Sequence, residues 1–501
     1  MMKYYLSIFL LVVLYSCSKN KSPFTSEASH CESYTSKIKL GLTKELDSID
    51  NLLKTETGVC VLETGTSSLL NRAWLCEQAE ERIDIQYFIF SADNIGLIAC
   101  DYLVKAADRG VIVNILVDDI LVDAEVSDLA TLNKHENINI KVYNPGVNLG
   151  KNIFQKLTKF ATDYRDANQR MHNKAFIVDG KTAITGGRNM ADEYFDYDHV
   201  YNFRDRDVLI LGKDVTQLSK SFDTFWNYDQ SVDVDELIDI DQTDHTPDFE
   251  PLHQYACNPE NFWPEVRAQL DTFHLFDNKI TWIDNLQYIS DIPGKNDGTH
   301  SLSGGGITTD SLIALVKKAK HRICIQTPYL VTTEESRALF KDIVSQGIEV
   351  QILTNSLAST DALEAFGAYQ TDRQKVLETG IEVYEYKPHA AVQKTLMTGA
   401  LHKDKEKQPI FGLHAKSLVI DDHIVAIGTF NLDPRSTHLN TECYTVFKSK
   451  TVAQEVLKTM ERDLLPENSW RITPEFNPDH TVDRTKRIKV WTRKIVPKNI
   501  L

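Results

Sequence analysis

The chain is 501 residues long and carries a formal net charge of −16 at pH 7, with 42% hydrophobic and 9% aromatic residues. This composition is that of a globular protein with ample core, and it excludes a chain that is disordered throughout. The negative charge argues against a general nucleic-acid binder, because affinity for a phosphate backbone comes chiefly from clustered Lys and Arg.

The eight cysteines include no C-x-x-C pair. Their spacing therefore predicts neither a zinc site nor a disulfide scaffold. Cys100, Cys324 and Cys443 lie in apolar runs and are predicted to be core residues.

The N-terminus has the form of an export signal. Lys3 precedes an apolar run, Tyr4 to Tyr15, that is too short to span a bilayer as a helix. The run ends in Leu14-Tyr15-Ser16-Cys17, which resembles a bacterial lipoprotein signal. Residues 1–17 are therefore predicted to be a signal peptide with Cys17 lipidated; the alternative is an uncleaved anchor. Both place the protein in the bacterial cell envelope, tethered to a membrane outside the cytoplasm.

The next segments alternate between helix and strand. Residues 18–60 are polar and are predicted to be a tether that ends in a short helix at about 44–53. A first lobe follows over 61–240. Its predicted elements are a helix at 69–81, a strand at 83–89, a helix at 96–108 ended by Gly110, and a strand at 111–117.

The same order of elements recurs over residues 307–465. The predicted copies are a helix at 312–320, a strand at 322–326, a helix at 334–346 ended by Gly347, and a strand at 348–353. The whole lobe is therefore predicted to be duplicated. Residues 241–306 are acidic, aromatic and then glycine-rich, which predicts a flexible linker, and 466–501 form a basic C-terminal tail.

Alternating strands and helices predict an α/β fold. Each lobe is expected to hold a mixed or largely parallel β-sheet flanked by helices. A pseudo-twofold relation between two such lobes would bring equivalent residues of both to one shared active site.

One stretch occurs twice and marks that site. The first copy consists of His172, Lys174, Asp179, Gly186 and Asn189, and the second of His414, Lys416, Asp421, Gly428 and Asn431, at the same spacing. Each copy is predicted to be a strand, a tight turn and a second strand, with the imidazole and the ammonium group on one face. A single His-x-Lys pair carries little weight, whereas five identities at matched spacing argue against chance.

Two imidazoles and two ammonium groups in one pocket favour an anion as ligand. Neither copy supplies carboxylates or thiolates at ligand spacing, so no metal and no other cofactor is expected. The two lysines, helped by the amides of Asn189 and Asn431, could hold the non-bridging oxygens of a phosphodiester. One histidine would then attack phosphorus while the other protonates the leaving alkoxide.

A carboxylate behind each imidazole would fix its tautomer. Asp205 and Glu442 are candidates by position, and Asp207 is nearly as good. Asp179 and Asp421 stand at odd spacing from the histidines, which favours a role in the turns. They are included among the candidate site residues because they complete the repeated motif.

The repeated pattern resembles the HKD motifs of the phospholipase D superfamily. Gly187 and Thr429 stand where that family has serine, which would weaken one phosphate contact. Longer strings resemble bacterial cardiolipin synthases of the C type, namely residues 170–174, 186–195, 353–358 and 431–442. The resemblance runs from about Leu69 to the C-terminus.

The resemblance implies two phospholipase D-like lobes that transfer a phosphatidyl group through a phosphohistidine to an alcohol, without a metal. The product would be cardiolipin, made from phosphatidylglycerol and either phosphatidylethanolamine or a second phosphatidylglycerol. In that family the first motif supplies the nucleophile and the second the acid, which assigns these roles to His172 and His414. From the sequence alone, the near symmetry of the copies leaves the two roles open.

Two stretches carry signals of a membrane surface. Residues 151–170 place apolar side chains near helical spacing among Lys and Arg, typical either of a helix on anionic headgroups or of an ordinary amphipathic helix that closes lobe one. The tail at 482–501 mixes basic residues with Val490, Trp491 and Ile495. The expected partners are phospholipid substrates and a membrane surface, without nucleic acid, and the oligomeric state is left open.

Three functions remain in play. The first is a phosphatidyltransferase, and the second is a hydrolase of the same fold, a phospholipase D or other phosphodiesterase with water as acceptor. The third, an inactive phospholipid-binding module, is disfavoured by two intact motifs. How well water is excluded separates the first two and is not legible in a sequence. The longer strings favour the transferase.

Overall fold

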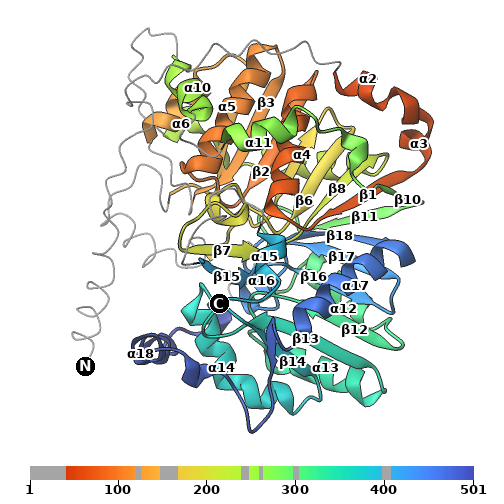
Figure 1. Cartoon of the computed structure of the whole chain (residues 1–501), viewed down its shortest axis with the longest axis vertical. Coiled ribbons are helices and arrows are strands. Elements are labelled where there is room, and N and C mark those ends of the chain that lie inside the picture. The colour runs from red at the N-terminus through yellow and green to blue at the C-terminus, as the bar shows by residue number, and fades with distance from the viewer. Residues whose placement is uncertain are drawn as a thin grey trace.

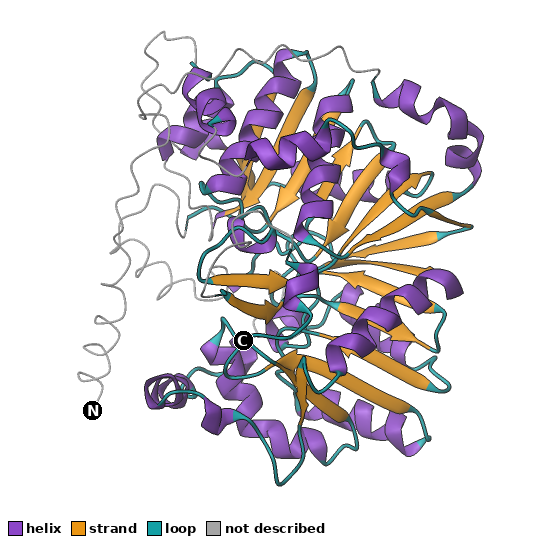
Figure 2. Ribbon diagram, viewed as in Figure 1, coloured by secondary structure: helices purple, strands orange, loops and turns teal. Residues whose placement is uncertain are grey.

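The computed structural model describes residues 41–119, 126–146, 168–237, 248–258, 263–296, 304–397 and 408–501. Two mixed β-sheets lie at the centre of the molecule, one per lobe, and helices flank both (Figure 1, Figure 2). The structure confirms the predicted α/β fold with two similar lobes. The signal peptide, the tether up to residue 40 and most of the 151–170 stretch lie outside the described residues.

The elements of lobe one follow the chain in the expected alternation. Its strands are β1 (Thr57–Leu62), β2 (Arg82–Tyr87), β3 (Ile112–Asp118), β4 (Ile138–Tyr143), β5 (Ala175–Val178), β6 (Thr182–Gly186), β7 (Tyr201–Arg204), β8 (Asp207–Gly212), β9 (Ser231–Asp233) and β10 (Thr281–Ile283). Its helices are α2 (Leu42–Leu46), α3 (Asp50–Thr55), α4 (Gly65–Gln78), α5 (Asn94–Asp108), α6 (Val126–Asn133), α8 (Val215–Trp226), α9 (Val234–Leu237), α10 (Glu250–Cys257) and α11 (Trp263–Leu270).

Lobe two repeats the alternation. Its strands are β11 (Leu286–Ser290), β12 (Arg322–Gln326), β13 (Glu349–Asn355), β14 (Glu382–Tyr386), β15 (Ile410–Leu413), β16 (Ser417–Ile420), β17 (Ile424–Gly428), β18 (Cys443–Lys448) and β19 (Ser469–Arg471). Its helices are α12 (Ile307–Val316), α13 (Glu334–Ser345), α14 (Leu363–Leu377), α15 (Gln393–Leu396), α16 (Pro434–His438), α17 (Lys450–Leu464) and α18 (Arg484–Arg493).

The strand order shows the duplication directly. Within the described residues, the order β8-β6-β5-β2-β3-β4-β9 of the first sheet repeats as β18-β17-β16-β12-β13-β14-β19 in the second. In both sheets the three central strands β2-β3-β4 and β12-β13-β14 are parallel, while the motif hairpins β5-β6 and β16-β17 are antiparallel. The predicted pairs of helices and strands correspond to α4-β2-α5-β3 and α12-β12-α13-β13.

Local sequence explains where these helices begin and end. Thr64, Asp93 and Thr333 accept a hydrogen bond from the backbone two or three residues into α4, α5 and α13, respectively. The predicted C-terminal glycines, Gly110 and Gly347, have φ of 94° and 84°, a conformation that glycine adopts without strain.

The two sheets share a core. One apolar cluster combines Val208 and Ile210 of β8 with Val425 and Ile427 of β17, and it includes residues of the flanking helices α8 and α17. Because these helices pack over the interface between the two sheets, apolar packing holds the lobes together in addition to the chain that connects them. Cys100, Cys324 and Cys443 are buried, which confirms their predicted place in the core.

The stretch predicted to be a flexible linker differs from that expectation. Its described part contains α10 and α11, and it supplies the strands β10 and β11. Strand β10 pairs with β1 in the first sheet and β11 pairs with β18 in the second, so the chain crosses between lobes within residues 284–285. The basic tail likewise contributes β19, which pairs with β14.

No described helix is long and apolar enough to cross a membrane.

The short helix expected at 44–53 corresponds to α2 and α3, which are joined by a turn of 3₁₀-helix.

Candidate active site

The two His-x-Lys pairs lie immediately before strands rather than on them. Strand β5 begins at Ala175, directly after Lys174, and β16 begins at Ser417, directly after Lys416. Each pair belongs to an extended segment that enters its hairpin from the interface between the lobes. All four side chains are buried: His172 is 6% exposed, Lys174 1%, His414 5% and Lys416 4%.

Strand pairing between the lobes sets the position of His414. Strand β15, which ends one residue before His414, runs parallel to β7 of lobe one, with Leu413 opposite Arg204. The next residue of each strand therefore lies beside its counterpart. His414 Nδ1 is 2.6 Å from Asp205 Oδ2, although the two residues belong to different lobes.

The other histidine is placed by the equivalent pairing. Met171 forms a parallel bridge with Thr441, and the His172 backbone N–H donates to the Thr441 carbonyl at 3.0 Å. The following residues then meet, with His172 Nδ1 2.8 Å from Glu442 Oε2. Each histidine thus receives its carboxylate from the opposite lobe. The third candidate, Asp207, instead pairs with Arg72 and Ser68 inside lobe one.

Burial decides the protonation state of the imidazoles. It lowers the pKa of His172 to about 4, because Glu442 only partly offsets the burial and Lys174 adds to it. Burial and Lys416 lower the pKa of His414 to about 3. Both rings are therefore neutral near pH 7, and each donates its Nδ1 proton to a carboxylate, which leaves the lone pair on Nε2.

The carboxylates stay ionised despite their burial. Burial raises the pKa of Asp205, but His414 and Lys416 outweigh it and hold the pKa below its usual range. Burial likewise raises the pKa of Glu442, and His172 with Thr429 lowers it further than burial raises it. The site therefore holds two neutral rings, two anions and the lysines.

The lysines occupy different positions relative to their histidines. Lys174 Nζ donates to the His172 carbonyl at 2.8 Å, and Lys416 Nζ donates to the His414 carbonyl at 2.6 Å. Lys416 Nζ also lies 2.8 Å from His414 Nδ1 and 2.9 Å from His414 Nε2, so the ammonium group contacts both ring nitrogens. Burial and the charge of Lys416 lower the pKa of Lys174 to about 7, and burial lowers the pKa of Lys416 to about 8.

The motif asparagines sit in the loops that follow β6 and β17. The Asn189 carboxamide oxygen accepts from the Ile89 backbone N–H at 3.1 Å. The Asn431 side-chain oxygen is buried and has no hydrogen-bond partner among the residues described. Both loops are tied back to their sheet by equivalent bridges, Phe90 to Met190 and Leu330 to Leu432.

The two positions where the superfamily has serine differ in this chain. A Cβ atom at Gly187 would stand 2.1 Å from Asp205 Oδ1, so the side chain of Asp205 occupies that space. At the equivalent position, the Thr429 hydroxyl donates to Glu442 Oε2. Thr429 therefore orients a carboxylate, a contact that the sequence did not predict.

Aromatic rings that were not predicted as site residues enclose both imidazoles. The Phe88 ring centroid lies 5.0 Å from that of His172, and Tyr194 and Phe203 lie 5.1 and 4.6 Å from His414. These rings exclude water from the histidines, which is consistent with the low pKa of both. Tyr194 belongs to the string 186–195, the one signal in the sequence that pointed to it.

Asp179 and Asp421 lie away from this cluster, at the far ends of β5 and β16. Each carboxylate accepts three backbone N–H groups, of residues 80–82 for Asp179 and 320–322 for Asp421. Both residues also have positive φ in the hairpin turns, at 52° and 49°. Their place among the candidate site residues is therefore corrected. They fasten each hairpin to the neighbouring central strand, as the odd spacing suggested.

Comparison with known proteins gives consistent matches. Residues 75–226 and 312–464 each match the family model described as cardiolipin synthase, PLD-like domain. The chain is 32% identical to cardiolipin synthase C of Escherichia coli (strain K12) over 453 residues, 89% of this chain and 91% of that protein. It is also 32% identical to an uncharacterized protein of Helicobacter pylori over 466 residues, 90% of this chain and 87% of the relative.

A solved structure shows the same fold. The phosphatidylserine synthase of Haemophilus influenzae superposes with a TM-score of 0.58 at 12% sequence identity, covering 91% of this chain and 100% of that one.

Proposed function

Because the chain belongs to the phospholipase D superfamily, in the family of cardiolipin synthase PLD-like domains, we propose that it is a phosphatidyltransferase that makes cardiolipin from two phospholipids. The observation that carries this proposal is the pair of neutral imidazoles, His172 on Glu442 and His414 on Asp205, each with its Nδ1 proton held by the other lobe. This arrangement suits two-step transfer through a covalent intermediate.

In the first step, one Nε2 lone pair attacks the phosphorus of a phosphatidyl donor. The P–N bond forms as the bond to the headgroup oxygen breaks. The other imidazole, which is neutral in the free site and takes up a proton when the anionic phosphodiester binds beside it, gives that proton to the departing oxygen. In the second step, the glycerol hydroxyl of phosphatidylglycerol gives its proton back to that imidazole and attacks phosphorus, which frees the first histidine. The ammonium groups of Lys174 and Lys416 hold the non-bridging oxygens.

The surroundings of the two Nε2 atoms support His172 as nucleophile and His414 as acid. Among the described residues, none forms a hydrogen bond with His172 Nε2, so its lone pair is free to attack. His414 lies against the Lys416 ammonium, whose Nζ is 2.8 Å from Nδ1 and 2.9 Å from Nε2, so its Nε2 lone pair is less available for attack. The acid then becomes the base of the second step without further rearrangement.

A hydrolase is the alternative function, since the same residues transfer the phosphatidyl group to water if water reaches the intermediate. Burial of all four histidine and lysine side chains favours the transferase, because a closed site protects a phosphohistidine from hydrolysis. Two complete histidine–carboxylate pairs disfavour an inactive binding module.

The C-terminal helix α18 and the residues just after it, up to Ile495, support a membrane surface as partner. Val490 is buried in the core of lobe two, whereas Ile488, Trp491 and Ile495 are 52%, 71% and 75% exposed. Arg484, Arg487, Arg493 and Lys494 lie among them in the sequence. Such a mixture of large apolar and basic side chains suits an anionic lipid surface.

We also propose that Cys17 tethers the enzyme to a membrane of the bacterial cell envelope. The lipoprotein-like N-terminus supports this location.

Product analysis tests the proposal. Purified protein is mixed with phosphatidylglycerol vesicles, with and without phosphatidylethanolamine, in the presence of a chelator, and the lipids are identified by mass spectrometry. Cardiolipin is the expected product. Phosphatidic acid as the sole product would make the protein a phospholipase D. The absence of both cardiolipin and phosphatidic acid would overturn the proposal.

A further inference from the structure

Lobe two contains a large apolar cavity between its sheet and the helices α12 and α13. Its volume is about 580 Å³, within the range of about 300–1,000 Å³ typical of ligand pockets. We call it the lobe-two cavity. Its apolar walls come from both helices, from the strands and from the loop after β17, and they include Leu312, Ile313, Leu339, Phe340, Leu418 and Phe430.

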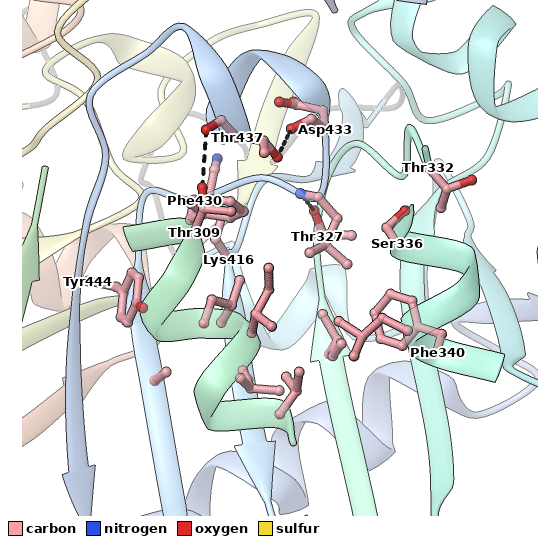
Figure 3. A pocket seen from close by; sticks show the side chains of 18 of the residues that line it. Thr309, Thr327, Thr332, Ser336, Phe340, Lys416, Phe430, Asp433, Thr437 and Tyr444 are labelled. Carbon is pink, nitrogen blue, oxygen red and sulfur yellow. Dashed lines mark hydrogen bonds between the residues drawn. The ribbon is translucent and has the colours of Figure 1, made fainter. Parts of the chain in front are cut away.

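The cavity adjoins the active site at one residue. Lys416, one of the two motif lysines, lines it together with Asp433 and Thr437. Figure 3 shows Lys416, Thr309 and Phe430 at one end of the cavity and Phe340 toward the other. A ligand bound by its phosphate at Lys416 could therefore extend along α12 into an apolar space.

The duplicated fold shows that this space is not a necessity of the architecture. The equivalent region of lobe one, between its sheet and α4 and α5, holds a cavity of only about 20 Å³. Leu312 corresponds to Arg72 at the spacing that relates Gln326 to Gln86, and Leu339 corresponds to Tyr102 when both helices are counted back from Gly347 and Gly110. Both lobe-one residues are larger and line the small cavity. Arg72 is fixed there by Tyr87 and Asp207. The same fold is thus filled in one lobe and open in the other.

Helix α12 is also unusually exposed for its composition. Its sequence, ITTDSLIALV, is largely apolar, yet the helix buries only Thr308, Thr309 and Val316. Ile307 and Ile313 are 49% and 36% exposed. An apolar helix above an apolar cavity is the arrangement expected when an apolar ligand completes the packing, since such cavities stay dry and accept apolar molecules.

We propose that the lobe-two cavity takes one acyl chain of a phospholipid substrate while the phosphodiester of that lipid lies at Lys416 and the two histidines. This inference rests on the proposed function and adds to it that the enzyme selects its lipid substrate by acyl-chain length. Each methylene that enters the cavity should raise affinity about four-fold, the equivalent of about 0.8 kcal/mol.

The test is a series of phosphatidylglycerols with six- to ten-carbon chains, each assayed below its critical micelle concentration. The wild type should show kcat/KM that rises with every added methylene. Leu312→Trp, or Leu339→Tyr, which copies the lobe-one residue, fills the cavity and should flatten this dependence, so that the loss of kcat/KM relative to the wild type is smallest with the shortest lipid and grows with each methylene. The matched control is Ala314→Trp, on an exposed position of α12 that does not line the cavity, and it should keep the wild-type dependence.

Two results would overturn the inference. One is an unchanged dependence on chain length in both cavity-filling variants, and the other is an equal loss of rate at every length, which would mean damage to the site rather than to a chain pocket. If the wild type formed neither cardiolipin nor phosphatidic acid from any lipid, the proposed function itself would be wrong. Fluorescence titration with a C18 polyene fatty acid then still reports whether the cavity binds a chain, because binding should be lost in Leu312→Trp and kept in Ala314→Trp.

Discussion

His172 Nδ1 lies 2.8 Å from Glu442 Oε2, across 270 residues of chain and across the boundary between the lobes. His414 and Asp205 form the equivalent contact in the opposite direction, at 2.6 Å. Each motif histidine therefore pairs with a carboxylate of the opposite lobe. The chemistry depends on docking of the lobes, which β15, β7 and the shared core fix.

Glu442→Gln should lower kcat about 10²- to 10⁴-fold, the range of general acid–base catalysis, with little change in KM. The amide keeps the shape but loses the charge that holds the His172 tautomer. Asp205→Asn should behave alike through His414. Stopped assays on short-chain phosphatidylglycerol measure both, with Glu378→Gln, an exposed carboxylate at the end of α14, as control. Near-normal kcat in either variant would contradict the role of the crossed carboxylates.

Activity should fall at alkaline pH. Lys174 and Lys416 have pKa values of about 7 and 8, and both act in the charged form, which is present below the pKa and lost above it. The value of kcat/KM, which reports the free enzyme, should thus decline from about pH 7 upward. A bound phosphodiester raises both pKa values, so the decline of kcat should begin at higher pH. A kcat/KM that stays constant to pH 10 would exclude buried lysines as phosphate ligands.

Gly187→Ala should impair catalysis by His414, because it displaces the carboxylate of Asp205 that orients this imidazole. The new Cβ would stand 2.1 Å from Asp205 Oδ1, so the carboxylate must move away from His414. We expect kcat to fall about 100-fold or more, with thermal unfolding near that of the wild type. Thr429→Ser, at the equivalent position, keeps the hydroxyl that holds Glu442 and should remain active. Full activity of Gly187→Ala would show that Asp205 is free to shift without consequence.

Trp491→Ser combined with Ile495→Ser should weaken binding to phosphatidylglycerol vesicles. Each side chain is largely exposed, and its insertion into lipid is worth about 1.5–3 kcal/mol, or about ten-fold or more in affinity. Vesicle sedimentation measures the loss, and the rate with monomeric short-chain lipid should not change. Phe276→Ser, an exposed aromatic residue outside α18, is the control. If the double variant bound vesicles as well as the wild type does, α18 would not be part of the membrane-binding surface.

Much of the fold could be predicted because the chain repeats itself. The recurrence of helix, strand, helix and strand at equivalent spacing predicted the second sheet from the first, and Gly110 and Gly347 marked equivalent helix ends. The linker was predicted less well. Its strands β10 and β11 are short edge strands, whose pairing with β1 and β18 depends on partners distant in sequence.

The sequence predicted which residues form the candidate site, but it did not predict which carboxylate pairs with which histidine. Asp205 and Asp207 lie one and three residues beyond the end of β7, and local sequence does not tell which one faces a histidine. The parallel register of β15 against β7 makes that choice, and it is a contact between lobes. The lobe-two cavity is invisible to sequence patterns for the same reason, since Leu312 is an ordinary apolar residue of a helix until its neighbours are placed.

The covalent intermediate tests the central claim most directly. A phosphatidyl donor with a p-nitrophenol leaving group needs no acid, so His414→Ala should release one nitrophenolate per chain in a burst and retain the phosphatidyl group on His172. Mass spectrometry at alkaline pH should find that adduct, and His172→Ala should show neither burst nor adduct. A wild type that forms product while neither it nor His414→Ala ever carries phosphorus on a histidine would contradict the two-histidine account.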